Sequence, residues 1–123
     1  MRWLHGTLRG VTVMQVQLWQ AGRPTWQPPI NAFRCAAGIR ICADLAGVAK
    51  ETIDLTVEPR RVVVRGQREA PEPEDVQALQ VLALEIDYGP FEREIALPAE
   101  VNMAEARAEQ VNGLLWISLP WKK

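Results

Sequence analysis

Residues 85–120, EIDYGPFEREIALPAEVNMAEARAEQVNGLLWISLP, decide the fold of this chain. Proline and glycine divide the stretch into three runs of strand-like composition. In the first run, residues 91–97, Phe, Arg, Ile and Leu alternate with Glu and Ala, the period-two pattern of a strand with one buried face. The same alternation returns at Leu115, Ile117 and Leu119. The stretch therefore predicts strands that pack into a sheet, and nothing in it resembles an active site.

Asn112 and Gly113 separate the second run, residues 105–111, from the third, residues 114–119. Both residue types adopt the positive φ angles that a two-residue turn needs, so the last two runs are predicted to form a hairpin. Residues 104–110 also have a helix-forming composition, but this segment is short.

Further strands are predicted upstream, at residues 30–35, 39–44, 53–58, 62–64 and 79–86. The last of these also fits a short helix, and a strand is preferred because its neighbours are strands. No long amphipathic helix is present to cover a parallel sheet. About eight short strands with a turn signal every eight to twelve residues predict an all-β antiparallel β-sandwich.

The length of 123 residues fits one domain with one hydrophobic core. Apolar residues make up 48% and charged residues 24%, which is typical of a globular protein. Residues 1–43 hold five Arg and no acidic residue, whereas residues 44–123 hold nine Lys or Arg against fifteen Asp or Glu. These two parts either attract one another or form separate solvated faces. The net charge of −1 does not favour binding to nucleic acid or membrane.

No apolar run approaches the ~20 residues that span a bilayer, and Arg9 and Gly10 interrupt any signal-peptide core. The expected location is therefore cytoplasmic. Cys35 and Cys42 are then expected to be reduced, and small buried core residues are the preferred interpretation of both.

The N-terminal arm, residues 1–26, holds three of the five Trp and an alternating apolar run that favours a strand over a helix. An arm of this kind must dock on the domain or be covered by another chain. The predicted organisation is an arm and linker at 1–27, a domain at 28–121 and a residual tail at 122–123.

The residues needed for catalysis are sparse. The only His is His5 and the only Ser is Ser118, so a Ser-His-acid triad is not expected. Cys35 and Cys42 would have only His5 as a base, and neither has metal-ligand spacing. The Gly residues are scattered at turns rather than gathered in a phosphate-binding loop. We expect no enzyme activity, no cofactor and no metal.

A series of short motifs resembles the α-crystallin domain of the small heat-shock proteins over residues 28–120. Each motif is weak alone, but all occur in the family's order and spacing. They are ADLAGV at 43–48, KETI at 50–53, VVVRGQR at 62–68, YGPFER at 88–93, LP at 97–98, AEQVNGLL at 108–115 and LP at 119–120.

The resemblance implies an immunoglobulin-like sandwich that dimerises and acts as an ATP-independent holdase in the stress response, binding unfolding clients. In bacterial and plant members a loop strand pairs with the sheet of the partner, and residues 79–84 match it, on a segment (67–87) long enough to reach across. The arginine of the F-x-R motif is expected near that interface, although a surface arginine is the alternative. The implied dimer-interface residues are Leu79, Val81, Leu82, Leu84 and Arg93.

The sequence also departs from the family pattern. Ala46 replaces the usual Pro of the turn, and no I-x-I/V motif follows Trp121, so large assemblies built through that tail are not expected. The resemblance places the groove for that motif between residues 53–57 and 106–111. The implied groove residues are Ile53, Leu55, Val57, Ala106, Ala108 and Val111.

We hypothesise that Val11, Thr12 and Val13 fill this groove, because they have the spacing of the missing motif and strand addition is a general mode of recognition. The alternative is that residues 11–18 add to the core or stay disordered. Trp116 either contacts clients or covers the second sheet. The predicted client and arm contacts are Trp3, Val11, Val13, Val16, Leu18 and Trp19.

Two other functions remain open at this point. One is a non-chaperone adaptor or structural module that uses the same sandwich to bind one dedicated partner. The other is a co-chaperone with a related sandwich, which is disfavoured because the YGPFER and AEQVNGLL motifs belong to the crystallin branch.

Overall fold

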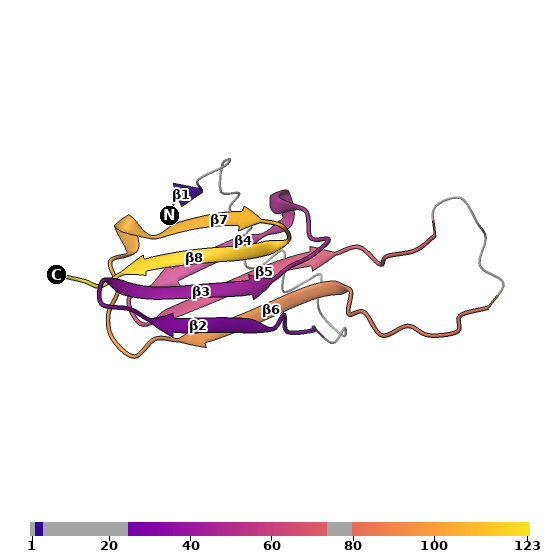
Figure 1. The fold of residues 1–123 in the computed structure, drawn as a ribbon, viewed down its shortest axis with the longest axis horizontal. Coiled ribbons are helices and arrows are strands. Elements are labelled where there is room, and N and C mark those ends of the chain that lie inside the picture. The colour runs from indigo at the N-terminus through magenta and orange to yellow at the C-terminus, as the bar shows by residue number, and fades with distance from the viewer. Residues whose placement is uncertain (1, 4–24, 74–79) are drawn as a thin grey trace.

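The strands of the chain form two sheets that stack as a sandwich, as Figure 1 shows. The computed structural model describes residues 2–3, 25–73 and 80–123, the first pair by backbone only. The strands are β1 (Arg2–Trp3), β2 (Ile30–Arg34), β3 (Gly38–Asp44), β4 (Asp54–Glu58), β5 (Arg61–Arg68), β6 (Gly89–Ala96), β7 (Arg107–Val111) and β8 (Leu114–Pro120). Two 3-10 helices, η1 (Lys50–Thr52) and η2 (Met103–Glu105), precede β4 and β7.

The five-stranded sheet has the order β1-β7-β8-β3-β2, and the three-stranded sheet has the order β4-β5-β6. The named strands pair antiparallel, except for β1, which runs parallel to β7. The predicted all-β antiparallel sandwich is therefore confirmed. Residues 107–111 form a strand despite their helix-compatible composition, because their pairing with β8 satisfies the backbone.

The hairpin predicted at Asn112 and Gly113 joins β7 to β8. Both residues have positive φ, 53° and 80°, which gives the turn the twist of the strands that it connects. The carbonyl of Gly113 accepts a hydrogen bond from the backbone N–H of Leu45 at 2.9 Å. The turn after β3 is thus fastened to the hairpin.

The core lies between the sheets and follows the predicted alternation. On β8 the side chains of Leu115, Ile117 and Leu119 are almost fully buried, while those between them are partly exposed. Phe91 of β6 has no exposed surface. Its ring passes so close to Gly66 that a methyl group there would lie 2.5 Å from the ring, so β5 has a glycine at this point.

Two sequence-based predictions differ from the structure of the single chain. Residues 80–86 form no strand here, because they leave the sandwich between β5 and β6 and have no neighbouring strand among the described residues. Cys35 is exposed at the turn between β2 and β3, because it follows the last paired residue of β2. Cys42 is buried, as expected, and both cysteines are free. Within the described ranges, no helix is long and apolar enough to cross a membrane.

Candidate functional site

The candidate site comprises the two edges of the five-stranded sheet and the segment that projects beyond it. We call that segment the excursion; it spans residues 69–88 and joins β5 to β6. Figure 1 shows its described parts extending past one end of the sandwich, whereas the C-terminus lies at the other end.

The excursion exposes a row of large apolar side chains. Leu82 is 89% exposed, and Val81 and Leu84 are 65% and 63% exposed. The excursion has an outgoing leg after β5 and a returning leg before β6. A hollow of about 790 Å³ separates them, with Ala70–Pro73 on the outgoing leg and Gln80–Leu84 and Tyr88 on the returning leg. Apolar surface gathered on one projecting segment marks an interaction site. Leu79, the remaining predicted interface residue of this segment, lies outside the described residues.

β2 forms one edge of the five-stranded sheet. It pairs with β3 from Ile30 to Arg34, and the described residues include no strand on its other side. The Phe33 side chain on this strand is 50% exposed. An edge strand with a large apolar side chain is a ready template for another strand.

Arg93 lies beside this edge. It is opposite Val64 in the register of β5 and β6, so it belongs to the row that faces the other sheet. Its side chain is partly buried, and its Nη1 donates a hydrogen bond at 3.3 Å to the carbonyl of Pro28, just before β2. The structure thus brings Arg93 to the side of the sandwich where β2 and β6 are the outermost strands.

β7 has the opposite edge, and here the chain supplies its own neighbour. Arg2 pairs with Arg107 and Trp3 with Ala108, so the N-terminus adds the short parallel strand β1. Sequence reasoning missed β1, because a pair of residues is too short to show periodicity. The other predicted arm contacts, residues 11, 13, 16, 18 and 19, lie outside the described part, as does the side chain of Trp3.

The predicted groove residues lie on or beside β4 and β7, the strands that come together at this side of the sandwich. Ile53, Leu55, Ala106 and Ala108 are buried in the core, whereas Val57 is partly exposed and Val111 is 40% exposed. The Gln110 side chain donates a hydrogen bond to the carbonyl of Val48 at 3.2 Å and closes one end of this region. A ligand would therefore meet β4 and β7 mainly through their backbones and through the two exposed valines.

The outer face of the three-stranded sheet is ionic. Arg61 donates hydrogen bonds to Glu58 at 2.5 Å and to Glu94 at 3.2 Å, and Arg65 donates one to Glu92 at 2.5 Å. The hydrogen bonds from Arg61 to its carboxylate neighbours raise the pKa of the guanidinium, Glu58 having the larger effect. Because these charges are matched within the sheet, this face is a poor candidate for an apolar ligand.

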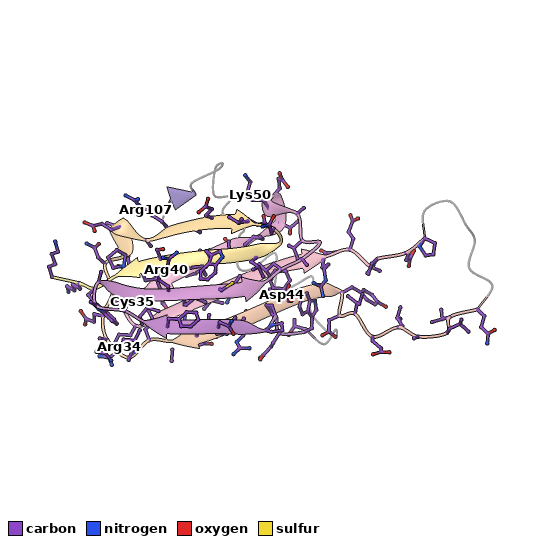
Figure 2. The ribbon with its side chains drawn as sticks, in the orientation of Figure 1. Arg34, Cys35, Arg40, Asp44, Lys50 and Arg107 are labelled. Carbon is purple, nitrogen blue, oxygen red and sulfur yellow. The ribbon has the colours of Figure 1, made fainter. Side chains whose placement is uncertain are left out.

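The outer face of the five-stranded sheet carries Trp116, which is partly exposed. The guanidinium carbon of Arg40 lies 5.4 Å from the centre of its ring. A hollow of about 590 Å³ opens here between β3, β8, β7 and η2. Figure 2 shows Arg40 on β3 and Arg107 at the start of β7, on this face of the sheet.

Cys42 lies on β3, opposite Asn31 of β2. Burial raises the pKa of its thiol, and the neighbouring Asp44 carboxylate adds to the rise. The raised pKa favours the neutral thiol over the more reactive thiolate.

Comparison with known proteins gives the family. A family model described as Hsp20/alpha crystallin family matches residues 33–123. Spore protein SP21 of Stigmatella aurantiaca is 32% identical over 99 residues, which are 80% of this chain and 57% of that protein. Small heat shock protein C2 of Rickettsia felis is 30% identical over 96 residues, which are 78% of this chain and 61% of that protein. The chain thus spans less than two thirds of the length of these curated relatives.

The solved structures agree with the sequence relatives. Heat shock protein 16.0 from Schizosaccharomyces pombe superposes with a TM-score of 0.69 at 25% identity, over 80% of this chain and 89% of that one. The family match covers the excursion, every strand from β3 to β8 and the last two residues of β2. The chain belongs to the Hsp20/alpha crystallin family.

Proposed function

We propose that the chain is an ATP-independent chaperone, a holdase that binds unfolding proteins through apolar surface and keeps them from aggregating. The observation that supports this most is that the chain belongs to the Hsp20/alpha crystallin family. Binding of this kind needs no bond to be made or broken, so the proposal includes no enzyme activity and no cofactor. It also keeps the cytoplasmic location expected from the sequence.

The second part of the proposal is a homodimer in which the excursion of one protomer pairs with β2 of the other. Residues 79–84 supply the strand, and Leu79, Val81, Leu82 and Leu84 supply the apolar contacts. Two features support this pairing: β2 lacks a neighbour on one side, and the excursion exposes apolar residues that its own sandwich does not cover. Arg93 then lies next to the added strand.

The third part concerns the other edge. We infer that the N-terminal arm occupies the groove of β4 and β7, with Val11 and Val13 as its contact residues, within one chain or from a neighbour. The pairing of β1 with β7 supports the idea that arm residues add to this edge. Docking from a neighbour would link dimers into larger oligomers.

Suppression of aggregation tests the chaperone proposal. Several unrelated client proteins are heated with the chain in the absence of ATP, and light scattering is recorded. We expect scattering to fall in proportion to the added chain for every client. Suppression for none of them would contradict the proposal and favour an adaptor for one dedicated partner.

A second measurement follows the mass of the assembly by light scattering, at rest and on heating. We expect a dimer or a larger even-numbered species at rest. A monomer at every accessible concentration would contradict the pairing of the excursion with β2.

A further inference from the structure

The guanidinium of Arg68 joins three segments that are distant in sequence. Its Nε and Nη2 both donate hydrogen bonds to the carbonyl of Asp87, at 2.9 and 2.5 Å. Its Nη1 donates one to the carbonyl of Ala46, at 2.9 Å, in the turn after β3. Because Arg68 is the last residue of β5 and Asp87 comes just before β6, these bonds tie together the two legs of the excursion at its base.

The same guanidinium lies over the ring of Trp26, the last residue of the N-terminal arm, with its carbon 4.2 Å from the ring centre. The indole Nε1 of Trp26 donates a hydrogen bond to the carbonyl of Gly89 at 3.1 Å. The ring also packs on Phe91, with centroids 5.2 Å apart. A cation over an indole face within about 6 Å is an attractive contact.

The backbone of Trp26 is fixed to the same place. Its N–H donates to the carbonyl of Pro90 at 3.3 Å, and its carbonyl accepts from the N–H of Glu92 at 3.2 Å. These bonds form a short parallel bridge between Trp26 and Phe91. The end of the arm therefore covers the free side of β6, where the excursion returns to the sandwich.

We propose that Arg68 and Trp26 form a clamp that couples the end of the N-terminal arm to the base of the excursion. Arginine suits this role because its planar group makes directed hydrogen bonds along its rim and stacks on an aromatic face at the same time. Losing either side chain loosens the contacts of the other. Coupling of this kind is reciprocal, so an event that pulls on the arm also changes the excursion.

A consequence for assembly rests on the proposed function. If the excursion pairs with β2 of a second protomer, the clamp sets the direction in which the excursion leaves the sandwich. Displacement of the arm, by a client for example, then weakens the dimer. This places the arm and the dimer contact under common control.

Hydrogen exchange of the full chain tests the clamp. Arg68→Lys keeps the charge but loses the planar fork, and Trp26→Leu removes the ring. We expect Arg68→Lys to speed exchange at the amides of Trp26 and Glu92, and Trp26→Leu to speed exchange at the amides of residues 86–89, each by about tenfold. In the double variant the increases are expected to be less than multiplicative.

The chain contains a matched control at the other end of the sandwich. The guanidinium carbon of Arg34 lies 5.2 Å from the centre of the Trp121 ring, and the Trp121 Nε1 donates to the carbonyl of Cys35 at 3.2 Å. Arg34→Lys and Trp121→Leu remove the same kind of contact far from the excursion. They are expected to leave exchange at Trp26 and at residues 86–89 unchanged.

Unchanged exchange at Trp26 in Arg68→Lys, or increases that simply multiply in the double variant, would overturn the clamp. If Trp26→Leu does not fold, Trp26→Phe keeps an aromatic face but removes the indole donor and is expected to act in the same direction. The dimer dissociation constant, measured on the same samples, separates the two proposals. Faster exchange with an unchanged dissociation constant supports the clamp and contradicts its control of the dimer.

Discussion

The two edges of the five-stranded sheet differ in whether a further strand lies beside them. At β7 the chain adds β1 from its own N-terminus, whereas at β2 the described residues add no strand. An unpaired edge strand is normally an aggregation hazard that proteins cover or blunt. The covered edge belongs to the region where we propose docking of the arm, and the open edge to the region where we propose docking of a second copy.

The difference indicates how a small sandwich can hold two docking sites that accept different segments. At Arg107 and Ala108 the covered edge can be reached only by a segment that displaces β1, so binding there competes with the chain itself. The open edge has no such competitor among the described residues, and the described parts of its proposed partner, the excursion, extend past the end of the sandwich. The first site is thus suited to regulation and the second to constitutive assembly.

The largest expected effect is at the open edge. Changing Leu82 and Leu84 to Asp places charges on the exposed apolar row that the partner is proposed to bury. Since each buried leucine contributes about 1.5–3 kcal/mol, the dimer dissociation constant should rise by about a hundredfold or more. Sedimentation over a range of concentrations measures it. Met103→Asp, on η2 and also exposed, is the control, and an equal loss of dimer there would show that charge alone is responsible.

The next effect concerns the hairpin that holds the covered edge. Gly113 has φ of 80°, and an added Cβ would lie 3.0 Å from the Cα of Ala46. Gly113→Ala should therefore lower the free energy of unfolding by about 1–3 kcal/mol, measured by urea denaturation. Gly89→Ala has a similar φ of 87° but no atom within 4 Å of the new Cβ, so it isolates the backbone strain. Equal losses in the two variants would show that contact with the turn after β3 does not matter.

A smaller effect is expected from removing residues 1–24, which takes away β1 and leaves Trp26 in place. Exchange of the β7 amides should rise about five- to tenfold, because the edge loses its neighbouring strand. The oligomer mass should fall if the arm links dimers, while the dimer dissociation constant stays the same. If neither the β7 exchange nor the mass changes, both β1 and the docking of the arm are contradicted.

Much of the sandwich was predictable because the patterns that specify its strands and turns lie within short stretches of sequence. The alternation on β6 and β8, and the positive-φ pair Asn112 and Gly113, each depend on a few neighbouring residues. The same rule fails for residues 80–86, whose β-forming composition meets no partner strand among the described residues. A strand forms only where a second strand satisfies its backbone, and periodicity does not report whether one exists.

The site was predictable only in part, for a related reason. The resemblance to the family pointed to Arg93 and to the strands of the groove, and the structure places these at the sides of the sandwich. It gave no sign that Arg2 and Trp3 pair with β7, or that Arg68 meets Trp26. These contacts join residues more than forty positions apart, so no local pattern encodes them.

The smallest expected effect uses the cysteines to report on the open edge. Cys35 is exposed beside the end of β2 and should react with iodoacetamide at once, whereas buried Cys42, opposite Asn31, should react only when β2 opens. Dimerisation over β2 should slow the alkylation of Cys42 further as the protein concentration rises.

The raised pKa of Cys42 also favours the folded state below the unfolded thiol pKa of ~8.5, and this stability is lost as the pH rises through the folded pKa. Cys42→Ala should therefore flatten the fall in urea midpoint between neutral and alkaline pH, and Cys35→Ala should not. An identical fall in Cys42→Ala and in the unmodified chain would show that this thiol is not linked to folding.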